Sequence, residues 1–459
     1  MSFAKYPAYK DSGVAWLGRV PGHWEVKRLR HVAALNPSKS EIAEFPRDTE
    51  VSFLPMEAVG DDGTLNLDRT RPIAEVESGY TYFREGDVTI AKITPCFEND
   101  KGAVMRGLHN GHGFGTTELI VARPSEGTTT SDYLHRLFTS RSFRMLGEAA
   151  MYGAGGQKRV PDDFVRDFAV AFPPLSEQTA IATFLDHETA RIDALVAEQE
   201  RLIALLQEKR QAVISHAVTK GLNPHAPMKD SGVAWLGEVP GHWEVRALRR
   251  VIGTIEQGWS PECDAREADE QEWGVLKAGC LNGGLYRPSE NKALPPELTP
   301  QDCYEVRVGD VLMSRASGSP ELVGSTALVT ATRARLMLSD KIFRLQLQDA
   351  VDARFFVAAL NSRPLRVQIE NALSGGNGMA NNLPQSSLLT FVMPVPPLAE
   401  QTVIATFLDH ETAKLDTLVT QARTAITLLQ ERRTALISAA VTGQIDVRGW
   451  VDAAQHQNQ

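Results

Sequence analysis

The chain has 459 residues. That is long enough to bury several hydrophobic cores, and length alone predicts about three domains. Its formal net charge of −9 comes without any basic block or tail, which excludes nucleic-acid binding through a basic tail, so any DNA contact must come from local patches or share the phosphates with a partner.

The first predicted element is a box rich in turns and tryptophan at 11–26, and it is written again at 230–245. DSGVAWLGRVPGHWEV and DSGVAWLGEVPGHWEV differ at one position. A second block at 173–196 returns at 396–419 with five differences in 24 positions. The two offsets, 219 and 223 residues, are nearly equal. A repeat this long predicts a pseudo-two-fold dimer within one chain rather than a solenoid.

Between the repeated blocks the sequence diverges almost completely. The two inserts, 27–172 and 246–395, hold short apolar runs separated by Gly, Pro, Asn and Asp, which are strand and turn signals. One helical stretch is predicted in each insert, at 132–150 and at 352–373. Both inserts keep a Gly-Asp-Val landmark and a later proline at matching offsets. We therefore expect two α+β domains with one fold and different surfaces.

A long helix is predicted at 173–222 and again near the C-terminus. Pro173-Pro174 stops the preceding strand, Ser176 suits an N-cap, and the apolar residues recur with a seven-residue period. The predicted seam residues are Leu185, Ile192, Leu195, Leu202, Leu206 and Val213 in the first helix, and Leu408, Leu415, Leu418, Leu429 and Leu436 in the second. Helices of about 44 residues, roughly 65 Å at 1.5 Å per residue, should pair as an antiparallel coiled coil.

The expected fold class is α+β, with two similar domains of mixed strands and short helices, two long paired helices and a pseudo-two-fold repeat. The predicted divisions are 1–172 for the first domain with its box, 173–222 for the central helix, 223–395 for the second domain with the repeated box, and 396–459 for the C-terminal helix and tail.

This order of elements resembles a known family. A tryptophan box, a variable domain and a helix starting PPLxEQxxIxxFLD, all present twice, are similar to the DNA specificity subunit of type I restriction-modification systems. The closing VTGQIDVRGW at 441–450 resembles the C-terminal tail of that family. The resemblance covers essentially the whole chain.

The resemblance implies a non-catalytic subunit with no cofactor of its own. Each variable domain would be a target recognition domain that reads one half of a split double-stranded DNA sequence. The helices would set the spacing and dock two methyltransferase subunits, which bind S-adenosylmethionine, and restriction subunits that use ATP and Mg would join them. The expected docking residues are Glu177, Gln178, Glu400 and Gln401.

The candidate DNA contacts lie in three segments of each domain: early in the domain, after the Gly-Asp-Val landmark, and in a glycine-rich stretch. Glycine lets backbone approach a groove, Lys and Arg suit phosphates and guanine edges, and Asn and Gln suit adenine edges. Ordinary solvated loops are the alternative. The candidates are Ser38, Lys39, Lys92, Thr94, Lys101, Gln157, Lys158 and Arg159 in the first domain, and Gln257, Trp259, Ser314, Arg315, Ser317, Ser319, Asn377, Asn381 and Asn382 in the second.

Two other motifs favour structural roles. The box tryptophans Trp16, Trp24, Trp235 and Trp243 are identical in both copies, so they cannot distinguish two half-sites and should pack against the helices. The His-Glu pairs at 187–188 and 410–411 lack the three or four converging ligands of a metal site. Packing or partner contact is the expected role.

Several absences narrow the function further. There is no [ND]PP[YF], no FxGxG and no GxxxxGK[ST], which argues against a self-sufficient DNA methyltransferase or an ATPase. A pure assembly scaffold, whose inserts bind protein instead of DNA, stays open. The four cysteines have no metal-type spacing, and no run of about 18 apolar residues or signal peptide is present. We therefore expect free thiols and a cytoplasmic protein without membrane spans.

Overall fold

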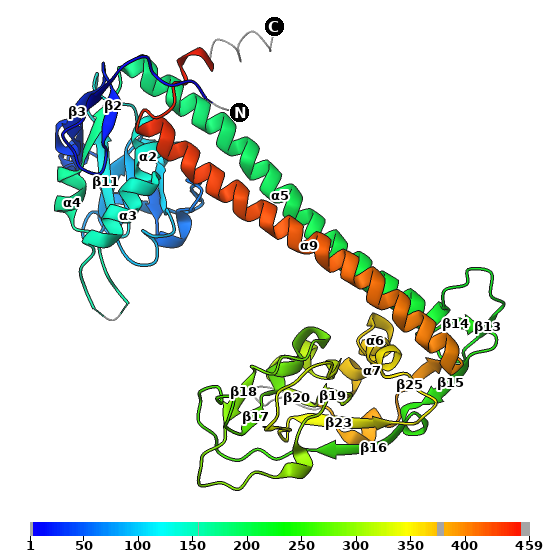
Figure 1. Cartoon of the computed structure of the whole chain (residues 1–459). Helices are drawn as coiled ribbons and strands as arrows, with labels where there is room; N and C mark the ends of the chain where they lie inside the picture. The colour runs from blue at the N-terminus through cyan, green and yellow to red at the C-terminus, as the bar shows by residue number, and fades with distance from the viewer. Residues whose placement is uncertain (1–2, 155, 374–380, 451–459) are drawn as a thin grey trace. The chain divides into compact units, whose positions relative to one another are not determined.

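The computed structural model describes residues 3–154, 156–373 and 381–450 (Figure 1). Its contacts divide the chain into two compact units, Met1–Gln199 with Arg423–Gln459, and Glu200–Ala422. Each unit holds one α+β domain and half of each of two long helices, α5 (Leu175–Lys220) and α9 (Leu398–Val441). No helix among the described residues is both long enough and apolar enough to cross a lipid bilayer.

The first unit contains twelve strands among its described residues, and short helices. The strands are β1 Tyr9–Asp11, β2 Arg19–Pro21, β3 Glu25–Arg28, β4 Ala33–Leu35, β5 Glu50–Leu54, β6 Thr70–Pro72, β7 Thr81–Arg84, β8 Val88–Ala91, β9 Gly102–Val104, β10 His112–Gly115, β11 Leu119–Pro124 and β12 Ala169–Phe172. The helices are α1 Ile73–Val76, α2 Ser131–Phe138, α3 Arg141–Ala150 and α4 Asp162–Asp167, with 3-10 turns η1 Leu29–His31, η2 Lys39–Ile42, η3 Met56–Ala58 and η4 His109–Gly111.

The second unit repeats this plan with small changes. Its strands are β13 Met228–Asp230, β14 Glu238–Pro240, β15 Glu244–Ala247, β16 Ile252–Gln257, β17 Gly274–Leu276, β18 Asn291–Ala293, β19 Val311–Ser314, β20 Ala316–Ser317, β21 Thr326–Leu328, β22 Leu336–Met337, β23 Ile342–Leu347, β24 Asn381–Asn382 and β25 Val392–Val395. The helices are α6 Ala353–Leu360, α7 Arg363–Ala372 and α8 Gln385–Leu388, with 3-10 turns η5 Leu248–Arg250, η6 Ala278–Gly284, η7 Asp302–Tyr304 and η8 Pro320–Leu322.

Both domains are built on two small sheets, formed by the strands that the apolar runs indicated. The first domain has the orders β4-β11-β8-β9 and β6-β5-β10-β7, and the second has β16-β23-β19-β21 and β18-β17-β22. Strands β8 and β11 pair antiparallel, as do their counterparts β19 and β23. These central strands bury nearly every side chain, because the helices of the domain cover one face of the sheet.

The single helical stretch predicted in each domain is wrong, because the structure has two helices there. In the first domain α2 ends and α3 begins around Ser140, whose hydroxyl donates to Leu137 O at 2.6 Å. In the second domain Ser362 donates in the same way to Ala359 O at 2.6 Å, between α6 and α7. A buried serine that bonds a carbonyl of the preceding turn competes with helix continuation.

Each domain enters and leaves the repeated frame through one pair of strands. Strand β3 pairs antiparallel with β12 in the first unit, and β15 pairs antiparallel with β25 in the second. The two ends of each variable domain therefore lie side by side. This closure is the structural basis for treating each insert as a module.

The start of α5 is bound to the first tryptophan box by a buried carboxylate. Glu177 accepts the indole N–H of Trp24 at 2.9 Å and the hydroxyl of Tyr6 at 2.5 Å, and His23 Nε2 lies 2.7 Å from its other oxygen. Trp24 is fully buried. A buried indole N–H needs an acceptor, and a carboxylate in the first turn of a helix is favoured by the helix dipole.

The next residue, Gln178, binds the domain instead of the box. Its side-chain carbonyl accepts the Thr129 hydroxyl at 2.9 Å, and its amide donates to Thr128 O at 3.0 Å, just before α2. In the second copy Gln401 accepts from Asp352 N at 2.9 Å and donates to Ala350 O at 3.1 Å. Both glutamines are fully buried.

These contacts correct the expected docking role of the Glu-Gln pairs. Glu177, Gln178 and Gln401 are buried and spend their polar atoms inside their own unit. Glu400 is the more exposed of the two glutamates, and it still accepts from Trp243 Nε1 at 3.1 Å and lies 2.7 Å from His242 Nε2. The structural interpretation of the box tryptophans is confirmed by the burial of Trp24 and Trp243.

The two ends of the chain cover the start of α5 in the first unit. Phe3 and Trp450 both meet the ring of Phe184 edge-on, at centroid distances of 5.4 and 5.2 Å. Phe184 is 0% exposed, whereas its counterpart in the second unit, Phe407, is 38% exposed. Among the described residues, Phe3 and Trp450 therefore cover the phenylalanine of the first copy, and the equivalent phenylalanine of the second copy stays partly exposed.

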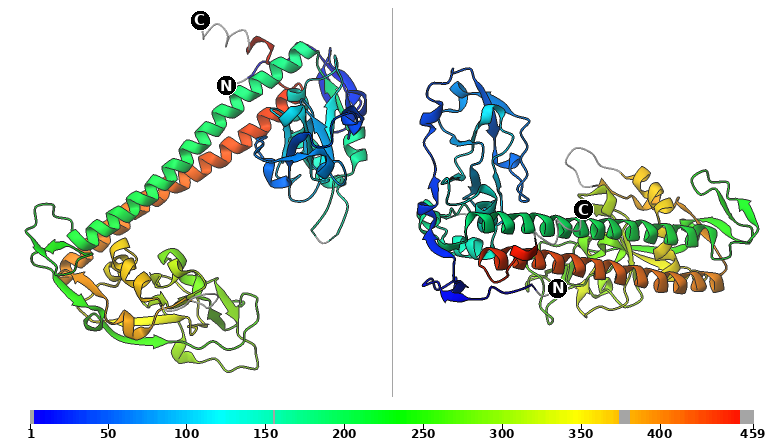
Figure 2. Two further views of the ribbon diagram at one scale, coloured as in Figure 1. Left: turned by 180° about the vertical axis from the view of Figure 1, so that it is seen from behind. Right: turned by 90° about the horizontal axis from the view of Figure 1, so that it is seen from above.

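Within each unit α5 and α9 lie side by side and run antiparallel, as predicted (Figures 1 and 2). Arg433 Nε lies 3.0 Å from Asp193 Oδ1 in the first unit, and Arg210 Nε lies 3.4 Å from Asp416 Oδ1 in the second. The predicted seam is buried or half-buried at one position of every heptad. These residues are Leu185, Ile192, Leu206, Val213, Leu408, Leu415, Leu429 and Leu436.

The other predicted seam position is wrong. Leu195, Leu202 and Leu418 are 38%, 42% and 45% exposed. The neighbouring Val196 and Ile203 are turned further inward than these leucines. On a helix of 3.6 residues per turn, the residues that face a partner helix are spaced alternately by four and by three. After Ile192 the prediction counted three residues, to Leu195, whereas the helix turns the residue four positions on, Val196, inward.

We expect Glu177→Ala to destabilise the first unit more than Glu400→Ala destabilises the second. Each buried donor left without an acceptor costs about 1–3 kcal/mol. Glu177 has a side-chain exposure of 5% and Glu400 of 29%, so water can replace the second carboxylate more easily. Hydrogen exchange followed by mass spectrometry measures this separately at β3 and β12 and at β15 and β25. An equal or greater loss of protection in the Glu400→Ala protein would contradict the expectation.

Candidate nucleic-acid interface

The candidate residues of the first domain meet where strands β8 and β11 open into loops. Lys92 N donates to Glu118 O at 2.8 Å, and Thr94 N donates to Lys158 O at 3.0 Å. Arg159 exchanges two backbone hydrogen bonds with the exposed Tyr152. We call residues 92–94, 116–118, 152–154 and 156–160 loop cluster 1. The structure thus brings Lys92, Thr94, Lys158 and Arg159 together from two separate predicted segments.

Arg159 is held by a carboxylate within loop cluster 1. Its Nε lies 2.9 Å from Glu118 Oε2 and its Nη2 lies 2.7 Å from Glu118 Oε1, a bidentate pair. Hydrogen bonding from the guanidinium lowers the pKa of Glu118 below its ordinary value. Glu118 was not among the predicted residues. Its position directly before an apolar strand run was the available signal.

Three other predicted residues of the first domain have local structural partners. Lys101 points its ammonium at two backbone carbonyls, Met56 O at 3.2 Å and Val59 O at 3.0 Å, so it is not a free DNA contact. Ser38 caps the turn η2 by accepting from the backbone of the second residue after it. Lys39 donates to a carbonyl after α1, and both it and Ser38 are exposed. Gln157 and Lys158 are exposed in loop cluster 1.

The second domain forms a matching cluster, which we call loop cluster 2, from residues 257–260, 315–319, 338–341 and 381–383. Asp340 lies at its centre. Its backbone O accepts from Gln257 Nε2 at 3.1 Å and from Arg315 Nη1 at 3.3 Å, and its Oδ1 accepts from the Ser260 hydroxyl at 2.5 Å. Asn381 Nδ2 donates to Gly318 O at 3.2 Å.

Residues 338–341 were not among the predicted DNA contacts, although Asp340 bonds to residues of two predicted segments. The available signal was their position in the repeat: Lys341 directly precedes β23, and Glu118 directly precedes the equivalent strand β11. The backbone bond from Lys92 N to Glu118 O recurs as Arg315 N to Lys341 O, also 2.8 Å. The two clusters therefore share backbone geometry and place opposite charges at one equivalent position.

Two predicted residues of the second domain are corrected by their burial. Ser314 is 1% exposed at the end of β19, so it cannot reach a ligand from the present fold. Trp259 is half-buried and packs against Val275, Leu294 and Met337, so it acts as part of a small core. Arg315 is half-buried with its guanidinium 5.5 Å from the ring centroid of Phe343.

The remaining residues of the second domain lie at the surface of loop cluster 2. Ser317 and Ser319 are partly exposed, and the Ser317 hydroxyl accepts from Ser319 N at 3.2 Å. Asn381 and Asn382 form β24, which pairs with β20. Asn377 lies outside the described residues.

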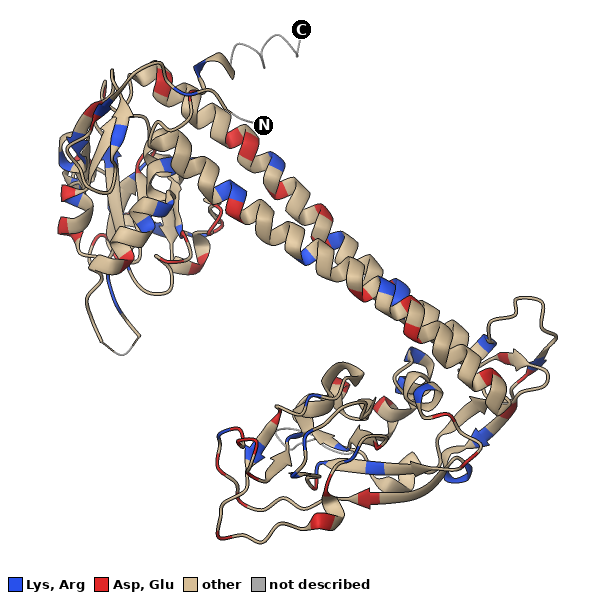
Figure 3. Cartoon of the chain, viewed as in Figure 1, with Lys and Arg blue, Asp and Glu red and all other residues tan. Residues whose placement is uncertain are grey.

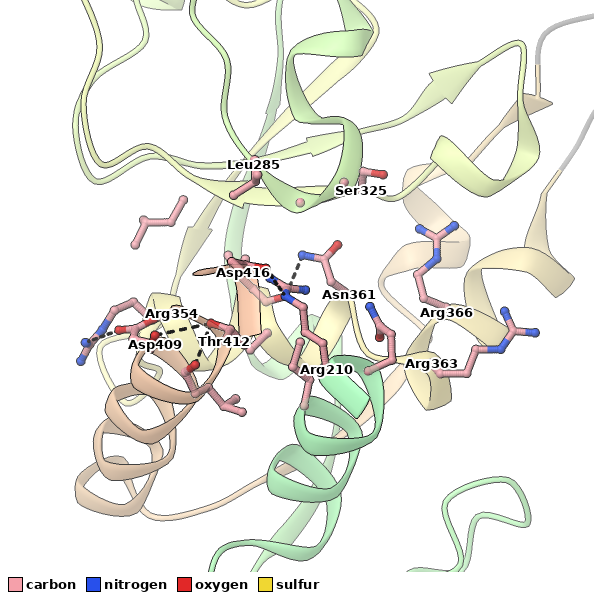
Figure 4. A pocket seen from close by; sticks show the side chains of 18 of the residues that line it. Arg210, Leu285, Ser325, Arg354, Asn361, Arg363, Arg366, Asp409, Thr412 and Asp416 are labelled. Carbon is pink, nitrogen blue, oxygen red and sulfur yellow. Dashed lines mark hydrogen bonds and ion pairs between the residues drawn. The ribbon is translucent and has the colours of Figure 1, made fainter. Parts of the chain in front are cut away.

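A groove of about 900 Å³ separates α6 and α7 from the long helices of the second unit (Figure 4). Arg354 Nη1 faces Asp409 Oδ2 at 3.0 Å across it, and Arg210 lies beside Asp416. Arg366 donates to two backbone carbonyls. These guanidinium groups already have partners. We therefore interpret the ion pair across the groove as a contact that attaches the domain to its long helices. The corresponding bond in the first unit joins Arg136 to Asp186 at 2.5 Å.

Basic and acidic residues are mixed along the described chain (Figure 3). Lys and Arg alternate with Asp and Glu along the long helices and in both domains. Among the described residues, no three His, Cys, Asp or Glu side chains are grouped closely enough to hold a metal ion. The two loop clusters are the places where predicted nucleic-acid contacts are brought together by the fold.

Comparisons with known proteins agree with the fold and the repeat. No family model matches the sequence. The chain is 31% identical over 469 residues to the EcoEI specificity subunit of Escherichia coli, covering 85% of this chain and 78% of that protein. It is 41% identical over 188 residues to the Escherichia coli EcoAI specificity subunit, covering 40% of this chain and 31% of that protein.

Solved structures match along nearly the whole chain. A chain from a structure on complex assembly and conformational transition of the type I R-M system aligns with a TM-score of 0.73 at 17% identity, over 92% of this chain and 98% of that one. The HsdS subunit of Thermoanaerobacter tengcongensis aligns with a TM-score of 0.56 at 19% identity, over 93% and 98%. Together with the sequence relatives, they show that this chain belongs to the type I restriction enzyme specificity subunits, the non-catalytic subunits that determine DNA specificity while catalysis lies in partner subunits.

Proposed function

We propose that each of the two domains reads one half of a bipartite double-stranded DNA target through its loop cluster. The observation that carries this proposal is the change from Glu118 to Lys341 at one backbone position of a duplicated frame. A frame repeated almost unchanged around two different loop clusters suits the recognition of two different half-sites. A scaffold that only assembled proteins would not need this divergence.

The side chains of the clusters suit base edges in the major groove. Arginine binds guanine O6 and N7 in a bidentate way, and asparagine binds adenine N6 and N7. Arg159, held by Glu118, is the candidate for guanine in loop cluster 1. Asn381 and Asn382 are the candidates for adenine in loop cluster 2.

The exposed apolar side chains of the long helices support docking of partner subunits. The first unit exposes Leu195 and Leu428, and the second exposes Leu202, Leu205 and Leu418. Leu202 and Leu205 are three residues apart on α5 and so share one helix face, where they form an exposed apolar pair that a partner protein can cover. We propose one methyltransferase subunit for each unit, with restriction subunits joining the same assembly.

The cofactors of the system belong to those partners in this proposal. S-adenosylmethionine would bind the methyltransferase subunits, and ATP and Mg would bind the restriction subunits. The chain has 48 basic and 57 acidic residues, so partners would also supply much of the phosphate neutralisation. Its place would be the cytoplasm, where the DNA is.

The test of the proposed function is an exchange of one domain. We expect that replacing residues 246–395 by the matching domain of a relative changes one half of the methylated motif and leaves the other half intact. The paired strands β15 and β25 place both junctions side by side, so the exchange should fold. Methylome sequencing of a host with the complete complex measures the motif. A change in both halves, or in neither, would refute modular recognition.

A second prediction concerns the bidentate arginine. We expect Arg159→Met to relax discrimination at one base pair of a single half-site, on the order of tenfold. Arg166→Met is the matched control, because Arg166 is exposed in the same domain and pairs with Asp163. Competition binding of the complete complex to duplexes with single substitutions measures the effect. Unchanged discrimination in the Arg159→Met complex would remove Arg159 from the recognition set.

A third prediction concerns the long helices as the spacer. One heptad added after Gln199 and one after Ala422 keeps the phase of the seam and lengthens both helices by about 10 Å at 1.5 Å per residue. We expect the non-specific spacer of the motif to grow by about three base pairs at 3.4 Å each. A four-residue insertion at both sites, which disturbs the phase, is the control and should cost stability. An active heptad variant with the original spacer would show that the helices do not set it.

A further inference from the structure

A small hollow in the second domain is lined by three lysines. It has a volume of about 380 Å³ and lies against loop cluster 2, with Ser260, Ser339 and Asp340 in its wall. Lys277, Lys292 and Lys341 come from three separate segments of the chain. Their convergence is therefore a product of the fold and not of a basic run in the sequence.

The charge of the hollow is not balanced by its own acids. Asp340 is the acidic residue among those that line it, and its Oδ1 already accepts from the Ser260 hydroxyl at 2.5 Å. Lys341 Nζ lies 3.3 Å from Asp340 Oδ2. Lys277 Nζ lies 3.8 Å from Oε2 of Glu290, a residue that does not line the hollow. Lys292 has no ion pair with the described residues. With Glu290 counted, three lysines face two carboxylates, and Lys292 is the cation left over.

A buried serine closes one side of the hollow. Ser339 is 4% exposed, and its Oγ is shut off from solvent without a hydrogen-bond partner among the described residues. The hydroxyl therefore lies behind the wall, and the lysines are the groups that face a ligand.

One wall residue of the hollow differs in charge between the two domains. Lys341 occupies the position that Glu118 occupies in loop cluster 1, where the carboxylate binds Arg159. The same backbone place therefore offers a cation in one domain and an anion in the other. An anionic ligand would be repelled by Glu118 and attracted by Lys341.

We propose that this hollow binds a backbone phosphate of the DNA beside the second half-site. This inference rests on the proposed function. The lysine ammonium groups neutralise the phosphodiester, contacts that fix position but read no bases. The hollow is continuous with the Asp340 turn that also holds Gln257 and Arg315. A phosphate seated there sets the register of loop cluster 2 on the duplex.

The first test is the salt dependence of binding by the complete complex with its methyltransferase subunits. Lys292→Met and Lys341→Met should each lower the slope of log K against log salt by about 0.9. They should weaken target and non-target duplexes by the same factor. Ser339→Ala should leave both the affinity and the slope unchanged, because its hydroxyl is closed off from the hollow. Lys229→Met, at an exposed lysine directly before the repeated box, is the control and should also change neither.

The second test uses duplexes in which one phosphate at a time is replaced by a neutral methylphosphonate. At one position beside the second half-site the replacement should weaken the unchanged complex several-fold and leave the Lys341→Met complex nearly unaffected. Additive losses at every position, unchanged salt slopes, or a methylated motif altered by the lysine substitutions would each overturn the phosphate site. The domain exchange separates this failure from failure of the proposed function, because a half-site that follows the exchanged domain leaves DNA recognition intact.

Discussion

The rest of the structure depends on the carboxylate that begins each long helix. The box supplies a fully buried indole, whose N–H can only donate, and the glutamate at the helix start supplies the acceptor. The following glutamine then bonds the segment that leads into α2 in the first unit and into α6 in the second. Two successive residues at the start of each long helix therefore connect the helix to both the tryptophan box and the domain. This explains why these short blocks are the parts that appear almost unchanged in both copies.

The same arrangement leaves the interior of each domain free to vary. The chain passes into and out of the domain through two paired strands, and the loop clusters lie on other segments of the domain. The loops can therefore differ in sequence while the connection to the helices stays the same.

The two copies are nevertheless not equivalent. Phe3 and Trp450 close the first unit over Phe184, whereas Phe407 stays partly open in the second. At the loop clusters, Glu118 and Lys341 give one backbone position opposite charges. The two copies of the frame therefore differ in how Phe184 and Phe407 are covered and in the charge that the loop clusters carry at one position. An acidic chain can accommodate this, because only local groups need to face a phosphate or a base.

The sequence by itself determined the duplication, the two α+β domains, the antiparallel helix pair and the family, because each depends on a repeated or periodic pattern. It also placed the inward positions Leu185 and Leu206, since a heptad period survives in the order of residues. Only the tertiary structure decided that Leu195 and Leu202 face outward, that Glu177 and Gln178 are internal, and that Lys101 bonds backbone carbonyls. Only the fold, too, brought Lys277, Lys292 and Lys341 to one hollow. The physical reason is that a side chain's direction and partners depend on residues distant in the chain, whose approach no local pattern records.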